Sequence, residues 1–395
     1  MKKKKGFTLI ELLAVIVVLA IIALIATPIV MNAIEKSKKG AAERSADNYI
    51  DAVETTVATE RLEGNILEGT YVINDKGNLE GNSLTEPLEI DMNGNKPSSG
   101  TITIKDGQVT TDTTLTIGDY TVSYNEENNK YEATELKKYT NGEVVYFNVT
   151  TGEKCSSSDY TETQSNVGTK SGCMKFYAFN DDGGDTVSLI LDHNTTATVA
   201  WISEADYVAA GGTESDYGIY GKNDKEPLTL LAQLKTDTSS WKGTETPANY
   251  IMDQTGQTSN AKYTIDYSSY KARLITAQEI ATITGNTSWD EKTASRDYYF
   301  DSKTDTESDT CKEGDTSGCK YGWLYDRTST FCTTYGCSNN SDKETYGYFT
   351  ASSSANSING AWSVVYYGSG SGIDVGGGAG YGVRPVIEVL RSKLN

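Results

Sequence analysis

The chain is short of basic residues, of proline and methionine, and of histidine. Its 395 residues contain 35 Lys and Arg against 54 Asp and Glu, so the formal charge at pH 7 is −19. Nucleic-acid backbones are bound mainly by Lys and Arg that neutralise phosphates, and the acidic balance therefore argues against nucleic acid as a ligand of the globular part. The chain is rich instead in Tyr, Thr, Ser, Gly and Asn, as extracellular β-rich modules often are, and its acidity suits a secreted surface.

The one histidine, His193, follows Asp192 at the end of an apolar segment. A catalytic base needs a nucleophile and an orienting acid within hydrogen-bond reach in space, and adjacency to an acid in the sequence supplies neither. We therefore expect His193 and Asn194 to be turn residues, with a catalytic or metal-binding role for His193 as the alternative.

A long apolar run begins close to the amino terminus. The lysines at positions 2–5 are followed by Gly6, and the run extends from Phe7 to about Met31 with one acid, Glu11, near its start. As a helix this run measures roughly 37 Å, enough to cross a hydrocarbon core of about 30 Å. The lysines hold that end in the cytoplasm, so the rest of the chain lies outside. The sequence predicts a single-pass membrane segment at 7–31.

The leader precedes the apolar run, whereas a secretory signal peptide is cut after it. A short basic leader that ends at Gly6, followed by Phe7 and Glu11, resembles the class III signal of type IV pilins and pseudopilins, and residues 6–12 match it without a departure. The resemblance implies that a prepilin peptidase cuts after Gly6 and that the new terminus, Phe7, is methylated. Cleavage removes four lysines and takes the formal charge from −19 to −23. The alternative is a plain signal anchor.

The same resemblance assigns roles within the helix and a location for the mature protein. A carboxylate inside lipid is costly and needs a partner; by resemblance Glu11 pairs with the amine of Phe7 on a neighbouring subunit during assembly. Pro28 removes a backbone hydrogen bond and is expected to kink the helix, as prolines at this place in pilins do. The implied location is first the cytoplasmic membrane and then a filament of pilin subunits at the cell surface.

The cysteines all lie beyond the apolar run, and their even number indicates three disulfides formed in an oxidising compartment. They are Cys155, Cys173, Cys311, Cys319, Cys332 and Cys337. Proximity in sequence suggests a bridge between Cys155 and Cys173 and leaves the pairing of the other four open. Those four are separated by seven, twelve and four residues, which does not match the paired CxxC knuckles of zinc sites, although zinc remains the alternative.

The length predicts two or three domains, which we place at 1–6 (leader), 7–31 (membrane helix), 32–137 and 138–395. In the domain at 32–137 the helix continues to about Leu62, and Gly64 is its expected stop. Its apolar stripe is formed by Ala46, Tyr49, Ile50, Val53 and Val57. Hairpins at Asp106-Gly107 and around 125–129, with short strands near 71–73 and 88–91, supply a sheet. This is an α+β domain in which a long helix packs on a small antiparallel sheet.

In the region 138–395 the sequence pattern changes: short predicted strands alternate with long loops rich in Gly, Ser, Thr and Asn. Strands are expected at 144–147, 186–191 and 197–201, and helices at 228–236 and 276–284. The second helix begins with Thr276 as N-cap and Glu279 three residues later, the pattern of a capping box. We expect a large, irregular, disulfide-linked α+β module.

Short islands in this module resemble domains related to the formylglycine-generating enzyme, a variant of the C-type-lectin-like fold. The islands are at 272–279, 323–327, 346–352, 361–364 and 381–389. Ile275 replaces the family's proline and Val383 its aromatic residue. The enzymes use a cysteine pair near the carboxy terminus, and this chain has none between Ser338 and Asn395, so we expect no enzymatic activity. By resemblance Arg384 is structural and pairs with a buried acid or with backbone carbonyls.

Candidate ligand sites in the module rest on few residues. Trp362, Tyr366 and Tyr367 are aromatic residues that could stack on a sugar or contact a protein. The acidic run at 181–185 could hold calcium, but it lacks the alternating pattern and terminal Glu of an EF-hand loop, so we expect a solvated acidic turn there and no cofactor.

The sequence therefore predicts a type IV pilin-like subunit, minor or at the tip, that displays a binding module for adhesion to a glycan or a protein. One alternative is a pseudopilin of a type II secretion or DNA-uptake machine, which would carry the same leader. An alternative of another class is a membrane-anchored surface enzyme.

Overall fold

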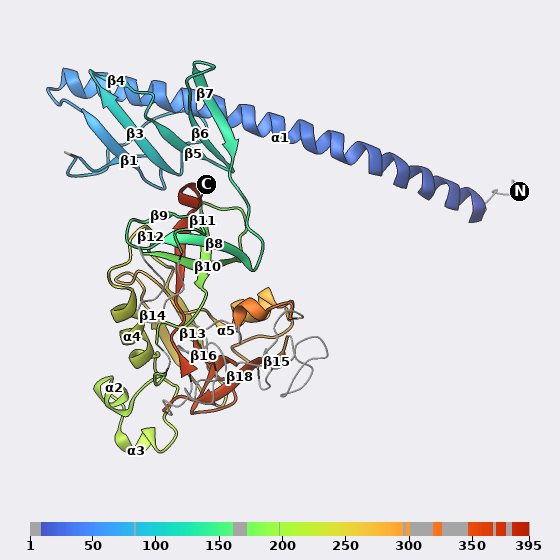
Figure 1. The fold of residues 1–395 in the computed structure, drawn as a ribbon, viewed down its shortest axis with the longest axis vertical. Helices are drawn as coiled ribbons and strands as arrows, with labels where there is room; N and C mark the ends of the chain where they lie inside the picture. Colours follow the sequence, from blue (N-terminus) through green and yellow to red (C-terminus); the bar gives the residue numbers. More distant parts are fainter. Residues whose placement is uncertain are drawn as a thin grey trace, which may run out of the picture. The chain divides into compact units, whose positions relative to one another are not determined.

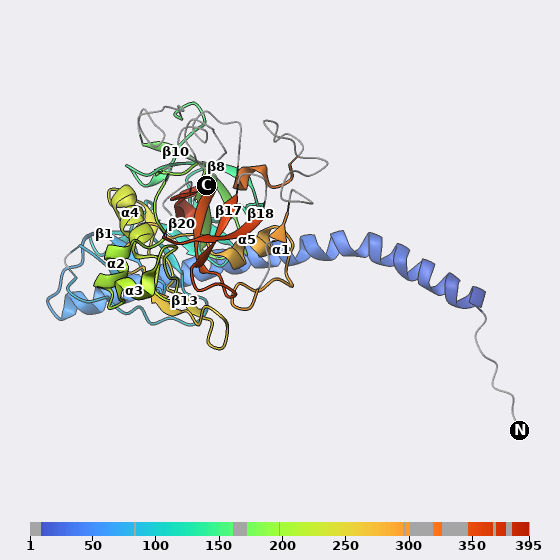
Figure 2. The ribbon, with the colours of Figure 1, turned by 90° about the horizontal axis from the view of Figure 1, so that it is seen from below.

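The chain divides into two compact units, residues 1–136 and residues 137–395. The computed structural model describes residues 9–82, 84–160, 172–196, 198–294, 298–300, 319–325, 347–365, 369–376 and 381–394. Figures 1 and 2 show both units as ribbons. Each unit is described by itself below.

The first unit is a helix packed on an antiparallel sheet. Helix α1 (Leu9–Leu62) is followed by a sheet with strand order β2-β1-β3-β5-β6-β7, and β4 pairs with β3. The strands are β1 (Gly69–Ile73), β2 (Leu79–Glu80), β3 (Ser99–Lys105), β4 (Gln108–Val109), β5 (Thr114–Ile117), β6 (Tyr120–Asn125) and β7 (Lys130–Glu135). Most of these strands pair with the next strand along the chain, so the sheet is built largely from local connections.

The predicted apolar stripe is the face that α1 presents to the sheet. Ala46, Tyr49 and Val53 are completely buried and Val57 nearly so, whereas Ile50 is partly buried. This confirms the sequence-based stripe, since residues three and four apart share one face of a helix. The Tyr49 hydroxyl also donates a hydrogen bond to the carbonyl oxygen of Gly77 at 3.0 Å.

Two glutamates of α1 join the helix to the sheet through their side chains. The backbone N–H of Ala133 on β7 donates to the Glu43 carboxylate at 3.2 Å, and the N–H of Val109 on β4 donates to Glu54 at 3.0 Å. Both glutamates therefore satisfy strand N–H groups that would otherwise lack a partner.

The predicted hairpins are present. Asp106 and Gly107 connect β3 and β4, and both have positive φ, 55° and 84°, as a two-residue turn of the primed type requires. Strands β6 and β7 form the second hairpin. The strand expected at 88–91 is wrong: only Leu88 makes an isolated bridge there, to Leu79. The bridge between Leu79 and Leu88 holds this segment against the sheet but does not add a strand to it.

Helix α1 is a single element from Leu9 to Leu62, and Pro28 lies inside it without ending it. The helix stops two residues before Gly64, whose φ is 94°, consistent with its predicted role as the stop. Among the residues that the structure describes, no helix is both long and apolar enough to span a membrane. The prediction of a membrane segment at 7–31 concerns a stretch in which, except at Val30, the side chains lie outside the described residues.

The described residues of the second unit form three sheets. The six-stranded sheet has the order β12-β20-β11-β10-β8-β9, the two-stranded sheet is β13-β14, and the five-stranded sheet has the order β15-β18-β17-β16-β19. The strands are β8 (Glu143–Asn148), β9 (Glu153–Lys154), β10 (Cys173–Phe179), β11 (Thr186–Leu191), β12 (Thr244–Glu245), β13 (Tyr250–Asp253), β14 (Lys262–Ile265), β15 (Tyr298–Tyr299), β16 (Gly347–Ser353), β17 (Gly360–Val365), β18 (Ser369–Asp374), β19 (Tyr381–Gly382) and β20 (Val386–Leu390).

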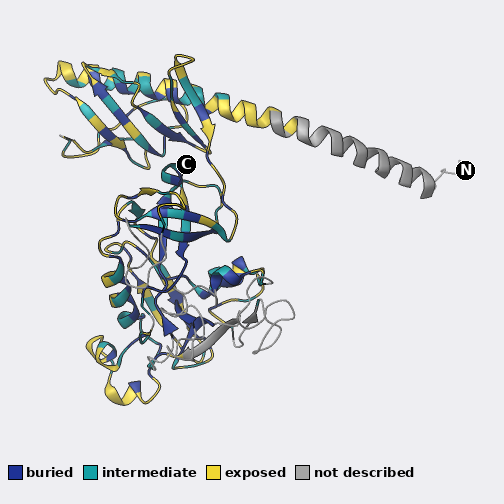
Figure 3. Ribbon diagram, viewed as in Figure 1, coloured by how far each residue is buried: buried dark blue, intermediate teal, exposed yellow. Residues whose placement is uncertain are grey.

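In the part of this unit that the structure describes, the α-helices are α2 (Glu204–Ala209), α3 (Glu214–Tyr217), α4 (Leu228–Thr238) and α5 (Ala277–Ile283). Short 3-10 turns occur at η1 (Gly322–Leu324) and η2 (Arg391–Leu394). All seven residues of β16 and all six of β17 are buried, and Figure 3 shows how much of this unit's sheet structure is enclosed. The described part of the chain is thus mixed α and β, with mainly antiparallel sheets.

Several predictions for this unit are confirmed. Strand β11 has the predicted bounds, β8 covers the expected strand at 144–147, and α4 begins at Leu228 as predicted. The capping box is present, because the Thr276 side chain accepts from the N–H of Glu279 and the Glu279 side chain accepts from the N–H of Thr276.

The strand expected at 197–201 is wrong for its described residues, 198–201. Instead of pairing along a ladder, the Val199 N–H donates to Tyr381 at 2.9 Å and the Trp201 N–H to Val375 at 3.1 Å. The apolar residues of this segment alternate because the segment packs against the chain at Val375 and at Tyr381, and not because it pairs as a strand.

Candidate functional site

The predicted processing and assembly residues belong to the amino-terminal segment. Gly6 and Phe7 lie outside the described residues. The backbone at Glu11 and Pro28 is helical, and their side chains are outside the described part. What the structure contributes here is the continuity of α1, which extends from the predicted cleavage region into the sheet-packed half of the first unit.

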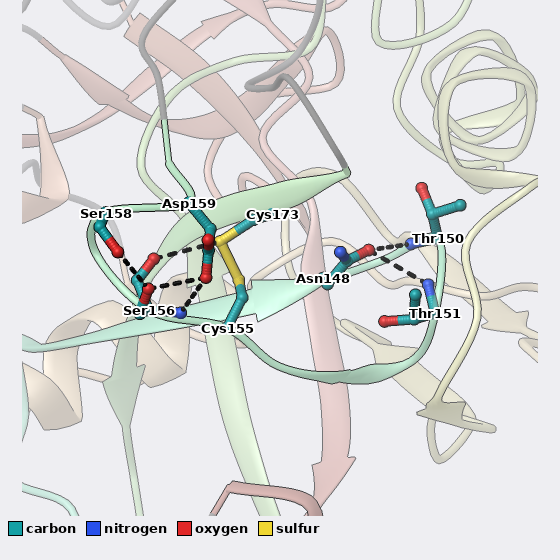
Figure 4. Close-up of a disulfide and its surroundings, with 8 residues drawn as sticks. All are labelled: Asn148, Thr150, Thr151, Cys155, Ser156, Ser158, Asp159 and Cys173. Atoms are coloured by element: carbon teal, nitrogen blue, oxygen red, sulfur yellow. Dashed lines mark hydrogen bonds between the residues drawn. A yellow bond between two sulfur atoms is a disulfide. The ribbon is translucent and has the colours of Figure 1, made fainter.

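A disulfide joins Cys155 and Cys173 in the second unit (Figure 4), the pairing that proximity suggested. Their Cα atoms are 6.0 Å apart, and the bridge ties the residue after β9 to the first residue of β10. Beside it, Asp159 accepts hydrogen bonds from the Ser156 hydroxyl at 2.6 Å and the Ser156 N–H at 3.0 Å, which lower the pKa of Asp159.

Cys319 is also disulfide-bonded, which excludes the zinc alternative for its sulfur. The other three candidate cysteines, Cys311, Cys332 and Cys337, lie outside the described residues. The pairing of this second group of cysteines therefore remains a prediction from the sequence.

Trp362 is part of the core and does not form a ligand-binding surface. Its side chain is only 2% exposed, and its ring packs edge-on against Trp289 at 4.9 Å between centroids. The interpretation as a stacking platform was wrong because every residue of β17 is enclosed, on both faces of the strand. Tyr366 and Tyr367 lie outside the described residues.

His193 lies in a bend directly after β11 and Asn194 follows it outside any strand, as expected for turn residues, and both side chains are buried together with Asp192. Asp192 forms an ion pair with Lys175 at 3.0 Å, and its side chain lies near His193, with 3.8 Å between Oδ2 and Nδ1. Burial alone would raise the pKa of Asp192, but the interactions with His193 and Lys175 outweigh burial and hold this pKa well below its usual value. The arrangement is a buried ionic cluster at the end of β11.

Arg384 is structural, and its partners are backbone carbonyls, one of the two expected arrangements. The guanidinium donates to Leu191 at 2.6 Å, to Asp192 at 3.0 Å, to Trp323 at 2.7 Å and also to Leu324. It is completely buried, so these four carbonyls replace water around the charge. A single side chain therefore fastens the 3-10 turn η1 to the end of β11.

The acidic run at 181–185 is only partly the solvated turn that was expected. The Asp181 side chain is fully enclosed and forms an ion pair with Arg391, and it accepts from the N–H groups of Tyr139 at 2.6 Å and Gly183 at 2.9 Å. Burial raises the pKa of Asp181, but the hydrogen bonds from Arg391 and the backbone outweigh it and lower the pKa. Its oxygens are therefore committed to the fold. Among the described residues no group of His, Cys, Asp or Glu is arranged to hold a metal ion.

A cavity of about 480 Å³ opens beside the outer strands of the six-stranded sheet. It lies where β12 and β20 approach the start of α5 and the residues around β13. The lining residues are Thr186, Glu245, Thr246, Ala248, Asn249, Tyr250, Tyr267, Arg273, Leu274, Thr276, Glu279 and Glu388. Its size falls in the range of small-molecule sites.

The charged part of this cavity is an ionic triad. Arg273 donates to Glu388 at 2.7 Å through Nε and to both oxygens of Glu279 at 2.8 and 2.9 Å through its two terminal nitrogens. The three side chains are 12%, 15% and 22% exposed, so they are mostly shielded from water. Burial lowers the pKa of Arg273, but its two carboxylate partners outweigh burial and raise this pKa above its usual value.

A second carboxylate cluster lies behind the cavity wall. Glu291 accepts hydrogen bonds from the hydroxyls of Tyr250 at 2.9 Å and Ser352 at 2.6 Å, and from the N–H of Gln278 at 3.0 Å. Burial raises the pKa of Glu291, and these hydrogen bonds only partly oppose the effect. Tyr250 thus connects the cavity lining to a buried acid.

The sequence analysis named some of the residues that line the cavity but did not predict that they lie together. Arg273 was part of a motif, Glu279 was assigned to a helix cap, and Glu245, Tyr250 and Glu388 were not singled out. The separation of 115 residues between Arg273 and Glu388 explains this, because no local pattern links the two. A weak signal was available in Arg273, since an arginine next to an apolar strand-like run often needs a buried acid.

Comparison with known protein families gives a match at the amino terminus. The family model described as the prokaryotic N-terminal methylation motif matches residues 1–27. No curated protein and no solved structure matches the chain. The match covers the leader, the predicted cleavage position, Glu11 and most of the apolar run. The amino-terminal motif therefore supports a type IV pilin-like or pseudopilin-like protein that is processed by a prepilin peptidase.

Proposed function

We propose that the protein is a minor or tip subunit of a type IV pilus-like filament and that residues 137–395 form a binding module for adhesion. The observation that carries the proposal is the methylation motif at 1–27 together with α1, which continues from that motif to Leu62 and packs on a sheet. A helix of 54 residues is roughly 80 Å long, so the motif and the sheet can act at well-separated places.

The size of the second unit supports a minor or tip position. This unit contains 259 of the 395 residues, about two thirds of the chain. Such an appendage on every subunit would crowd a filament, whereas one or a few copies at the end would not. The predicted lectin-like character of the unit remains part of this proposal, and so does the absence of an enzymatic role.

The first experiment is intact-mass and amino-terminal analysis of the protein recovered from sheared surface filaments. We expect a chain that begins with methylated Phe7. An uncut chain retained in the membrane would overturn the proposal and favour a simple anchored surface protein. Recovery of the processed chain only from the cell envelope, with loss of secretion or DNA uptake on deletion, would favour the pseudopilin alternative.

The role of Glu11 can be tested in the same preparation. Glu11→Ala is expected to leave membrane insertion intact and to reduce incorporation into filaments, because the carboxylate would no longer pair with the amine of Phe7. Glu35→Ala, on the same helix beyond the apolar run, is the matched control. Normal incorporation of Glu11→Ala would contradict the pairing.

A further inference from the structure

We propose that the cavity formed by Glu245, Tyr250, Tyr267, Arg273, Glu279 and Glu388 binds an amino sugar that carries a free ammonium group. This inference rests on the proposed binding function of the second unit and assigns it a place and a ligand class. The site is distinct from Trp362, which is buried in the core.

The first argument is charge. The lining contains three carboxylates, Glu245, Glu279 and Glu388, and one guanidinium, Arg273. Lys393, which is not part of the lining, lies 3.8 Å from Glu245 and offsets one more negative charge. The three carboxylates therefore outnumber the two cations, Arg273 and Lys393, and the cavity keeps a net negative charge. Because the triad is largely shielded from water, this excess favours a cation more strongly than the same charges would on an open surface.

The second argument concerns the kind of cation. The carboxylates of Glu279 and Glu388 are held by Arg273, and among the described residues no acidic group is arranged as a metal site. A metal ion needs several oxygens free to converge on one point. An ammonium group needs fewer acceptors and can share the Glu245 carboxylate with Lys393, because the Glu245 side chain is 39% exposed. The geometry therefore favours an organic cation.

The third argument concerns the body of the ligand. Tyr250 is partly buried and contributes an aromatic side chain to the cavity, whereas Tyr267 is 1% exposed and supports the cavity wall from the core; Thr186, Thr246 and Asn249 contribute hydroxyl and amide groups. An aromatic ring beside neutral hydrogen-bonding groups suits a sugar ring, which has apolar faces and hydroxyl edges. A lysine side chain would use the charge but make no hydrogen bonds with the hydroxyl groups of Thr186 and Thr246.

The test is a calorimetric titration of the full-length protein, in detergent micelles at low salt, with glucosamine and with glucose. The two probes differ by the ammonium group, and we expect glucosamine to bind at least about tenfold more tightly. Equal affinities, or no binding of glucosamine at all, would overturn the proposal. Nα-acetyl-lysine amide is the third probe: an affinity equal to that of glucosamine would show that the site takes any ammonium group and would overturn the sugar assignment.

Variants of Glu245 locate the binding. Glu245→Gln is expected to weaken glucosamine binding about threefold to tenfold and to leave glucose unchanged, and Glu245→Lys to abolish glucosamine binding. Glu214→Gln, an equivalent change in α3 outside the cavity lining, is the control. Unchanged glucosamine affinity in Glu245→Lys would place the ligand elsewhere. Tryptophan fluorescence verifies that each variant is folded.

The binding experiment and the assembly experiment test the two proposals separately. Glucosamine binding by a chain whose amino terminus is uncut would preserve this inference and overturn the proposed filament role. A chain that is processed and incorporated into filaments but does not bind glucosamine would preserve the proposed filament role and overturn this inference.

Discussion

The two units bury different kinds of side chains. Among the described residues, the buried polar side chains of the first unit are Ser99, Thr113 and Thr116, none of which is charged. The second unit buries sixteen, including Asp192, His193, Glu291, Arg384 and Arg391. The first unit is therefore held together mainly by apolar contacts between one helix and one sheet, whereas the second depends in addition on charges that must find partners inside the fold.

The difference follows from how each unit is connected. In the first unit, hairpins and a meander pair neighbouring segments, and the helix supplies one continuous apolar stripe. In the second, β20 pairs with β11 across about 200 residues, and long irregular segments lie between them. Backbone groups in those segments have no ladder to join, so buried side chains such as Arg384 supply hydrogen bonds instead.

The largest expected effect is from Arg384→Met. Removing the guanidinium takes the Arg384 donor from four carbonyls, three of which are in buried hydrogen bonds, and we expect a loss of about 3–5 kcal/mol in the free energy of unfolding of the second unit. All five tryptophans lie in that unit, so urea unfolding followed by tryptophan fluorescence measures it selectively. Lys262→Met, which changes an exposed cation, is the control. A loss below 1 kcal/mol would contradict the role assigned to Arg384.

Removal of the disulfide ranks next. The paired substitution Cys155→Ser and Cys173→Ser opens a loop with a sequence separation of 18, and we expect a loss of about 3 kcal/mol from the second unit. The same fluorescence-detected unfolding measures it. The first unit contains no cysteine, and its transition, followed by far-ultraviolet circular dichroism, should not move; a shift in both units would show that they do not unfold independently.

Val53→Ala tests the first unit. Val53 is completely buried between α1 and the sheet, and the shortened side chain is expected to cost about 2 kcal/mol in the first unit. The change should appear in far-ultraviolet circular dichroism, which detects both units, and not in tryptophan fluorescence. Thr55→Ala, an exposed substitution on the same helix, is the matched control. A fluorescence change in Val53→Ala would remove the contrast between the units.

The smallest effect is a pH dependence from Glu291. Because burial raises the pKa of Glu291 in the folded state, its contribution to stability is fully present at low pH and is lost as the pH rises through that raised value. Glutamine at this position cannot ionise. In Glu291→Gln the free energy of unfolding of the second unit should therefore depend less on pH above the usual titration range of a glutamate. Glu214→Gln should leave the profile unchanged. Parallel profiles for wild type and Glu291→Gln would mean that the Glu291 carboxyl ionises at its ordinary pKa.

Periodic and local features were predictable from the sequence. The stripe of α1, the Asp106-Gly107 turn, the capping box of α5 and the bounds of β11 depend on residues within a few positions of one another. The same holds for the amino-terminal motif, where the order of leader, Gly6, Phe7 and Glu11 is the whole signal.

Burial in the second unit was less predictable. From their neighbours in the sequence, Trp362 and Asp181 were assigned to the surface and His193 to a turn, yet all three side chains are enclosed. Their surroundings come from distant segments: Asp181 meets Arg391, and the residue next to His193, Asn194, donates to the carbonyl of Gly347. A polar residue in a loop-rich region has the same local sequence whether or not a distant partner covers it.

By itself, then, the sequence determined the processing motif, the long helix with its buried face and the bridge between Cys155 and Cys173. Only the tertiary structure decided which charges are buried, and it alone brought Arg273, Glu279 and Glu388 to one cavity. The physical reason is that helix periodicity and turn conformation are fixed over a few residues, whereas the partner of a buried charge is fixed by chain topology. Arg273 and Glu388 are 115 positions apart in the sequence, and the bridge between Arg273 and Val386 brings them side by side.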